Sequence, residues 1–222
     1  MFSIDFYFQI LSLVAAVYYY QKKRNKIPLY FIPFLFTTVV VEFLGWWWHS
    51  FKGVGNYALY NIFTILEFIF YSLLFYIHFR KPFLKRMALS FIPSFTFLAV
   101  LNISFVQGLT QTFNTYAFLL GSFFIVVFCC CFFYESVLPE KIDQQLSKQP
   151  LFWICSGLLI YYLGSVIINA LFEYLRSNDL REEGKRMYKI INHTLNVVLY
   201  SSFCISFYIC PDNKKTYSSQ LS

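Results

Sequence analysis

Seven apolar runs, each about twenty residues long, constrain this chain more than any other feature of its sequence. A helix needs about 20 apolar residues to cross the roughly 30 Å hydrocarbon core of a bilayer. The runs show no alternation of apolar and polar residues, as strands of a membrane barrel would. We therefore predict an all-α fold, a polytopic membrane helix bundle with seven transmembrane helices. They cover about residues 3–20, 29–48, 57–79, 87–106, 115–135, 152–175 and 190–210, and a short polar tail, 211–222, follows.

The composition agrees with this reading. The chain has 222 residues, of which 58% are hydrophobic and 13% charged, whereas about a quarter of a soluble domain is charged. Its 29 Phe and 18 Tyr residues exceed what one soluble core would hold, and lipid is the natural surrounding for the excess. We predict a multi-pass protein of the inner (cytoplasmic) membrane, in contact with the lipid bilayer and without a separate soluble domain.

The first run is the shortest and could be mistaken for a signal peptide. It has no basic segment before it, and no small-residue cleavage site follows Ala15 and Ala16. We therefore expect it to remain as a helix of the mature protein.

The basic residues predict the orientation. If the odd-numbered connections and the tail lie in the cytoplasm, that side holds twelve of the 18 Lys and Arg residues. The positive-inside rule then places the N-terminus outside and the C-terminus in the cytoplasm. The connection 176–189 carries five basic residues on the other side and is the exception. The net charge of +7 is thus explained by topology and contact with anionic lipid, and no basic face for nucleic acid is expected.

Polar side chains inside the membrane need a reason, because burying them in hydrocarbon costs free energy. In the predicted topology they gather near the outer leaflet, and several share one helix face at i, i+3 or i, i+4 spacing. Three such faces turned inward would form an outward-facing polar pocket for a small ligand or a proton. The alternative is that amides and hydroxyls only join helices. The candidates are Glu42, Asn61, Glu67, Asn169, Glu173, His193 and Asn196.

Glu67 and His193 are the most distinctive of these candidates. Glu67 falls near mid-membrane, where a carboxyl must find a partner or stay protonated. His193 is well inside a run and could be that partner if the third and seventh helices touch. One histidine with scattered carboxylates is a poor metal signature, so we expect neither metal nor cofactor. No nucleophile or catalytic motif is visible, and we predict that the protein is not an enzyme.

Three stretches resemble a group of uncharacterised Phe- and Tyr-rich seven-helix membrane proteins of Bacteroidetes. They are Tyr60-Asn61-Ile62-Phe63-Thr64-Ile65-Leu66-Glu67-Phe68, the segment from Gln149 to Ile154 with Gly157–Tyr162, and Ile190-Ile191-Asn192-His193 with Asn196 and Tyr200. The resemblance is loose in the first, fourth and fifth helices. It implies no activity, and a layout like that of membrane sensory modules that signal to a kinase.

Four functions remain open. The first is a sensory or signalling protein in which ligand or proton binding acts on a cytoplasmic or membrane partner. The alternatives are an accessory or scaffold subunit, a transporter or pore, alone or as an oligomer, and, least favoured, an intramembrane enzyme acting on lipid.

Overall fold

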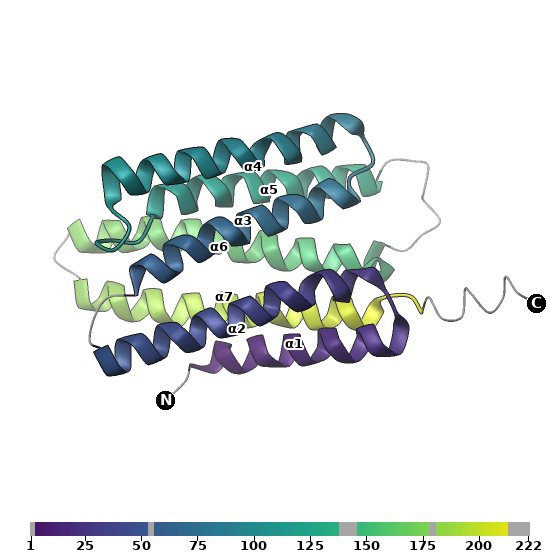
Figure 1. Cartoon of the computed structure of the whole chain (residues 1–222), viewed down its shortest axis with the longest axis horizontal. Coiled ribbons are helices and arrows are strands. Elements are labelled where there is room, and N and C mark those ends of the chain that lie inside the picture. The colour runs from purple at the N-terminus through teal and green to yellow at the C-terminus, as the bar shows by residue number, and fades with distance from the viewer. Residues whose placement is uncertain (1–2, 53–55, 138–145, 178–180, 213–222) are drawn as a thin grey trace, which may run out of the picture. The chain divides into compact units, whose positions relative to one another are not determined.

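The computed structural model describes residues 3–52, 56–137, 146–177 and 181–212, which contain seven α-helices and no strand (Figure 1). This confirms the all-α prediction for the described residues. The helices are α1 (Ile4–Lys23), α2 (Lys26–Lys52), α3 (Tyr57–His78), α4 (Pro82–Asn102), α5 (Thr115–Val137), α6 (Pro150–Ser177) and α7 (Arg181–Ile209). A π-helical segment, Ile103–Gln107, continues α4, and a short 3-10 helix, Leu146–Lys148, precedes α6. Nearly all of the predicted tail lies outside the described residues.

Six of the described helices, α2 to α7, are long and apolar enough to cross a membrane. The exception is α1, whose 20 residues include Asp5, Gln9 and Ser12. The sequence prediction of several membrane-spanning helices is confirmed to this extent, and the crossing by α1 stays a prediction.

The last helix begins at Arg181, before the apolar run that starts at Ile190. The prediction that residues 176–189 form a connection is therefore wrong for the stretch from Arg181 onward. Hydropathy marks where a chain enters hydrocarbon and does not mark where a helix begins. Ion pairs between side chains one turn apart favour a helix in polar residues too, and here Lys185 Nζ lies 2.6 Å from Glu182 Oε1 at i, i+3 spacing.

The chain divides into two compact units. Unit 1 contains Met1–Thr37 and Ile142–Ser222, and therefore α1, the start of α2, α6 and α7. Unit 2 contains Thr38–Lys141, and therefore the rest of α2 with α3, α4 and α5.

In unit 1, α7 packs against both α6 and α1 (Figure 1). Two glycines let α6 approach α7 closely, because a Cβ on Gly157 would lie 2.6 Å from Ser202 Cβ, and one on Gly164 would lie 2.6 Å from Leu195 Cδ2. These pairs also show that α6 and α7 are antiparallel. Such small-residue contacts are how membrane helices pack without a hydrophobic driving force between them.

The turn from α1 to α2 is fixed by local contacts. Arg24 adopts the left-handed conformation (φ 52°) that often ends a helix, and its N–H donates to Tyr20 O at 2.8 Å. Asn25 then caps α2, because its Oδ1 accepts the N–H of Ile27 at 2.9 Å. The side chain of Lys23 donates to the carbonyl oxygen of Cys210 at 2.8 Å.

Unit 2 is built around interlocking phenylalanine rings. The buried Phe68 on α3 meets Phe95 on α4 with a ring-centroid distance of 5.0 Å, and Phe128 on α5 meets Phe75 at 5.6 Å and Phe91 at 5.7 Å. Edge-to-face and tilted pairs of this kind add to area burial. They hold α3, α4 and α5 side by side (Figure 1).

Candidate functional site

An ionisable pair of one buried and one half-buried side chain joins α1 to α7. Oδ1 of Asp5 lies 3.0 Å from Nδ1 of His193, and the exposed fractions of the two side chains are 10% and 27%. The direction of the contact does not suit a hydrogen bond, so the attraction between these two atoms is mainly electrostatic. It is strongest when the imidazole is protonated, because a neutral histidine carries no charge.

Gln9 and Ser12 extend this polar patch along α1. Asp5, Gln9 and Ser12 follow each other at i, i+4 and i+7, and are therefore on one helix face. That face is buried, because the whole residues are 7%, 2% and 0% exposed. Among the described residues, Gln9 Oε1 has no hydrogen-bond partner, so it is an acceptor that a proton donor or a polar ligand could use. We call Asp5, Gln9, Ser12 and His193 the α1–α7 polar cluster.

The outer face of α1 shows the opposite character. Ile4, Tyr7, Leu11 and Val14 are each more than half exposed. A helix of a soluble protein buries its apolar face and exposes its polar one. Here the pattern is reversed, as expected for a helix whose outer side meets lipid.

The far ends of α1 and α7 also meet. The ammonium group of Lys23 donates to the carbonyl oxygen of Tyr208 in the last turn of α7 and to that of Cys210 just after it. These carbonyls lack partners within their own helix, and a cation is favoured there. Since Asp5 meets His193 and Lys23 meets Tyr208, α1 and α7 run parallel along their whole shared length.

Just beyond α7, burial of the Cys210 thiol raises its pKa to about 12, against the opposing effect of the Lys23 ammonium. This thiol is therefore poorly suited to act as a nucleophile or as a metal ligand near neutral pH.

In unit 2, Asn61 is fully buried and all its hydrogen-bonding groups have partners. Its Nδ2 donates to Leu109 O and to Thr112 O, both at 2.9 Å, and its Oδ1 accepts the N–H of Asn114 at 2.8 Å. The side chain thus fastens the segment between α4 and α5 to α3. This favours the structural alternative for Asn61 over ligand binding.

Asn114 is the centre of this amide cluster, which consists of Asn61, Asn102, Gln107 and Asn114. Oδ1 of Asn114 caps α5 by accepting the N–H of Ala117 at 3.4 Å, and it also accepts from Asn102 Nδ2. Asn102 Nδ2 donates to Gln107 Oε1 as well, at 2.7 Å. Amide side chains therefore join the beginning of α3, the end of α4 and the beginning of α5.

The remaining candidates of unit 2 are two half-buried carboxylates. Glu42 on α2 accepts a hydrogen bond from the hydroxyl of Tyr60 on α3, at 3.2 Å. Glu67 lies on α3 between Leu66, which is half exposed, and Phe68, which is fully buried.

In unit 1, two of the predicted amides bond within their own helices. Asn169 donates to Ser165 O at 2.7 Å, and Asn196 donates to Asn192 O at 3.0 Å. The side chain of Glu173 lies outside the described part of the chain. A contact of Glu67 with His193 would join the two units and stays a prediction, as does one pocket shared by all seven candidates.

Sequence reasoning missed Asp5 and Gln9. The signal was available, because these polar residues recur at helical spacing inside an otherwise apolar run, and such residues turn toward a protein interior. Their partner could not be read from the sequence. Among the described residues, no three His, Cys, Asp or Glu side chains gather as a metal site would require.

The helices and their lipid-type surfaces define the class: the chain is a polytopic α-helical membrane protein. Comparison with models of protein families, with curated proteins and with solved structures finds no match. The resemblance to the Bacteroidetes group therefore stays a prediction.

Proposed function

We propose that the chain crosses the membrane seven times, with the N-terminus outside, and that it senses protons through the α1–α7 polar cluster. The first part is supported by α1, which buries polar residues and exposes apolar ones. It is also supported by the parallel course of α1 and α7, because the first and seventh spans of an alternating bundle point the same way. The basic residues of the connections give the direction.

Two exposed positions test this topology. In a cysteine-free background, a cysteine at Gln111 should react with a membrane-impermeant maleimide added to whole cells, since it lies in the α4–α5 connection. A cysteine at Ser147, before α6, should react only after the cells are opened. The reverse pattern would overturn the predicted orientation, and labelling of both from outside would mean that α5 does not cross the membrane.

The sensing proposal is carried by one observation, the 3.0 Å approach of Asp5 Oδ1 to His193 Nδ1. Histidine is the side chain whose ordinary charge change falls between about pH 5 and 8. A proton on His193 would therefore change the force between α1 and α7. Because this pair is largely shielded from water, the change is screened less than at an exposed surface.

Other ionisable groups lie on the helices that pack around this pair. On α7, Lys189 lies one turn before His193, and the buried Tyr200 lies two turns after it. The ionisable side chains on α6 include the buried Tyr162. On α1, the phenol of Tyr7 is more than half exposed. In the described part of unit 1, Asp5 is the carboxylate paired with His193.

A change at this pair would be transmitted along two parallel helices. The Lys23 contacts hold the opposite ends of α1 and α7 together, so loosening the Asp5 end would tilt one helix against the other. The Lys23 end, with the basic turn around Arg24, is predicted to face the cytoplasm, whereas the Asp5 end is predicted to face outward. A cytoplasmic or membrane partner that contacts this turn would read the two packings as two states.

The test compares three variants in lipid nanodiscs by hydrogen exchange at pH 5 and pH 8. The wild type should protect α1 and α7 differently at the two values, and Asp5→Asn and His193→Gln should each remove the difference. Glu182→Gln, which neutralises an exposed carboxylate on α7, is the matched control and should keep it. Equal pH responses in Asp5→Asn and the wild type would refute the proposal.

A second function, that of an accessory or scaffold subunit, is favoured by the amide cluster of unit 2. Its side chains bond to backbone and to one another, as helix-joining groups do. This function predicts no pH response in α1 and α7, and a partner that co-purifies equally at both pH values.

A further inference from the structure

We propose that the groove between the beginning of α4 and the end of α5 binds one anionic phospholipid. Its acyl chain would lie in the groove and its phosphate would meet the ammonium group of Lys81. This proposal concerns unit 2 and is independent of the proton-sensing proposal.

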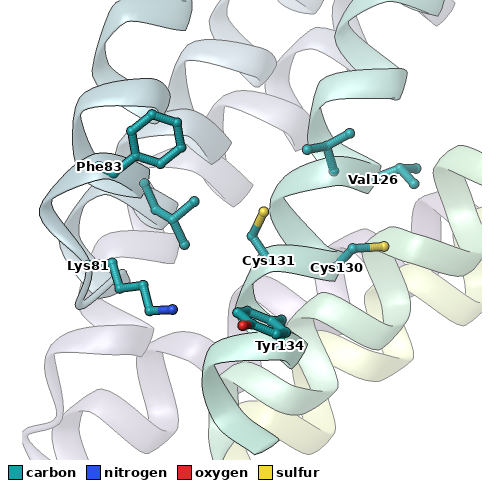
Figure 2. A pocket seen from close by; sticks show the side chains of 8 residues that line it. Lys81, Phe83, Val126, Cys130, Cys131 and Tyr134 are labelled. Carbon is teal, nitrogen blue, oxygen red and sulfur yellow. The ribbon is translucent and has the colours of Figure 1, made fainter. Parts of the chain in front are cut away.

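The groove is large enough for a lipid chain and almost wholly apolar. It has a volume of about 520 Å³, within the range of roughly 300–1,000 Å³ for small-molecule sites. Figure 2 shows Phe83 and Lys81 on one side and Val126, Cys130, Cys131 and Tyr134 on the other. Leu84 and Val127 complete the lining. An apolar channel open toward the bilayer is filled most favourably by hydrocarbon.

Among the described residues that line the groove, Lys81 is the charged one. Its Nζ lies 4.8 Å from the centroid of the Tyr134 ring, which holds the ammonium at the groove's end (Figure 2). The nearby Glu135 accepts the backbone N–H groups of Arg80 and Lys81, at 3.1 and 2.8 Å. Among the described residues, the Lys81 ammonium makes no ion pair with a carboxylate, so a phosphate could take that place.

The charge around this end of the groove selects an anionic headgroup. Arg80, Lys81 and Arg86 are exposed and Lys85 is half-buried, and all four lie within seven residues. Each basic residue beside an anionic membrane surface adds to the attraction, and clusters of four or more are typical of lipid-headgroup sites.

The groove also lies at the right depth. Lys81 immediately precedes the membrane-spanning stretch Pro82–Gln107, and Tyr134 lies close to the end of Thr115–Val137. The phosphate layer of a bilayer falls at such ends, where tyrosine rings are also favoured. The predicted orientation places this end in the cytoplasmic leaflet.

The experiment titrates dioleoylphosphatidylglycerol, and separately dioleoylphosphatidylcholine, into detergent-solubilised full-length protein and counts bound lipid by native mass spectrometry. The wild type should bind one phosphatidylglycerol more tightly than the rest, and phosphatidylcholine without such a step. Lys81→Gln should weaken that first binding about fivefold, as expected for the loss of one basic residue. Lys148→Gln removes the same charge at an exposed position outside the groove and should leave the affinity unchanged.

A second variant tests the groove separately from its charge. Val127→Trp would fill the channel and should abolish the first binding step while the helix content by circular dichroism stays the same. Equal affinities for the two lipids would overturn the proposal. So would a phosphatidylglycerol affinity that Lys81→Gln and Lys148→Gln lower equally, because the lipid would then follow overall charge. Should Val127→Trp fail to fold, the pair of lysine variants still decides.

Discussion

Replacing Asn61 by leucine should destabilise the protein by about 2–4 kcal/mol. The substitution keeps the branched shape of the side chain and removes two hydrogen bonds donated to Leu109 O and Thr112 O, and one accepted from Asn114 N–H. Helix-joining hydrogen bonds in membrane proteins contribute about 0.6–2 kcal/mol each. The two carbonyls lie in an exposed connection and can bond to water, so the loss of these two hydrogen bonds costs an amount near the low end of that range. The N–H of Asn114 is buried, and stranding it costs a further 1–3 kcal/mol.

The assay is equilibrium unfolding in mixed micelles with a rising fraction of dodecyl sulfate, followed by tryptophan fluorescence. Asn196→Leu is the matched control, because that amide donates one bond to a carbonyl of its own helix, Asn192 O. We expect its cost to stay below about 1 kcal/mol, since the carbonyl keeps its helical partner. If the two variants differ by less than about 0.5 kcal/mol, the reasoning that Asn61 fastens the α4–α5 connection to α3 is wrong.

Two further predictions rest on single contacts. Gly121→Ala should destabilise unit 2 by about 1–3 kcal/mol in the same assay, because its Cβ would lie 2.5 Å from the ring of the fully buried Phe68. An unchanged midpoint would show that the ring can move aside. Cys210, whose pKa is raised to about 12, should react with maleimide at pH 8 roughly a thousandfold more slowly than an ordinary thiol, and Lys23→Met should slow it further because the ammonium lowers this pKa. A rate equal to that of the unfolded chain would contradict the burial of this thiol.

The sequence predicted the helices well because their cause is local. Whether a stretch of twenty residues partitions into hydrocarbon depends on its own side chains, and six runs correspond to helices able to span a membrane. The first run is not among these helices, and it contains Asp5, Gln9 and Ser12, which the fold buries. The late start expected for the seventh helix came from equating apolar residues with helical ones.

The candidate site was predicted less well. Polar residues inside apolar runs were correctly taken as worth explaining, yet the sequence could not say which of them meet. Asn61 and His193 were both plausible ligand groups. In the structure, Asn61 has three hydrogen-bond partners in the segment that connects α4 to α5, and His193 faces a carboxylate on α1.

The sequence by itself determined that this chain is helical, that it belongs in a membrane, and which residues interrupt its apolar surface. The tertiary structure decided that His193 faces Asp5, that Asn61 binds the α4–α5 connection, and that Lys81 lies at the end of the apolar groove between α4 and α5. The physical reason is that hydrophobic partition adds up along the chain, whereas each contact depends on how two helices rotate and pack against each other across a long separation in sequence.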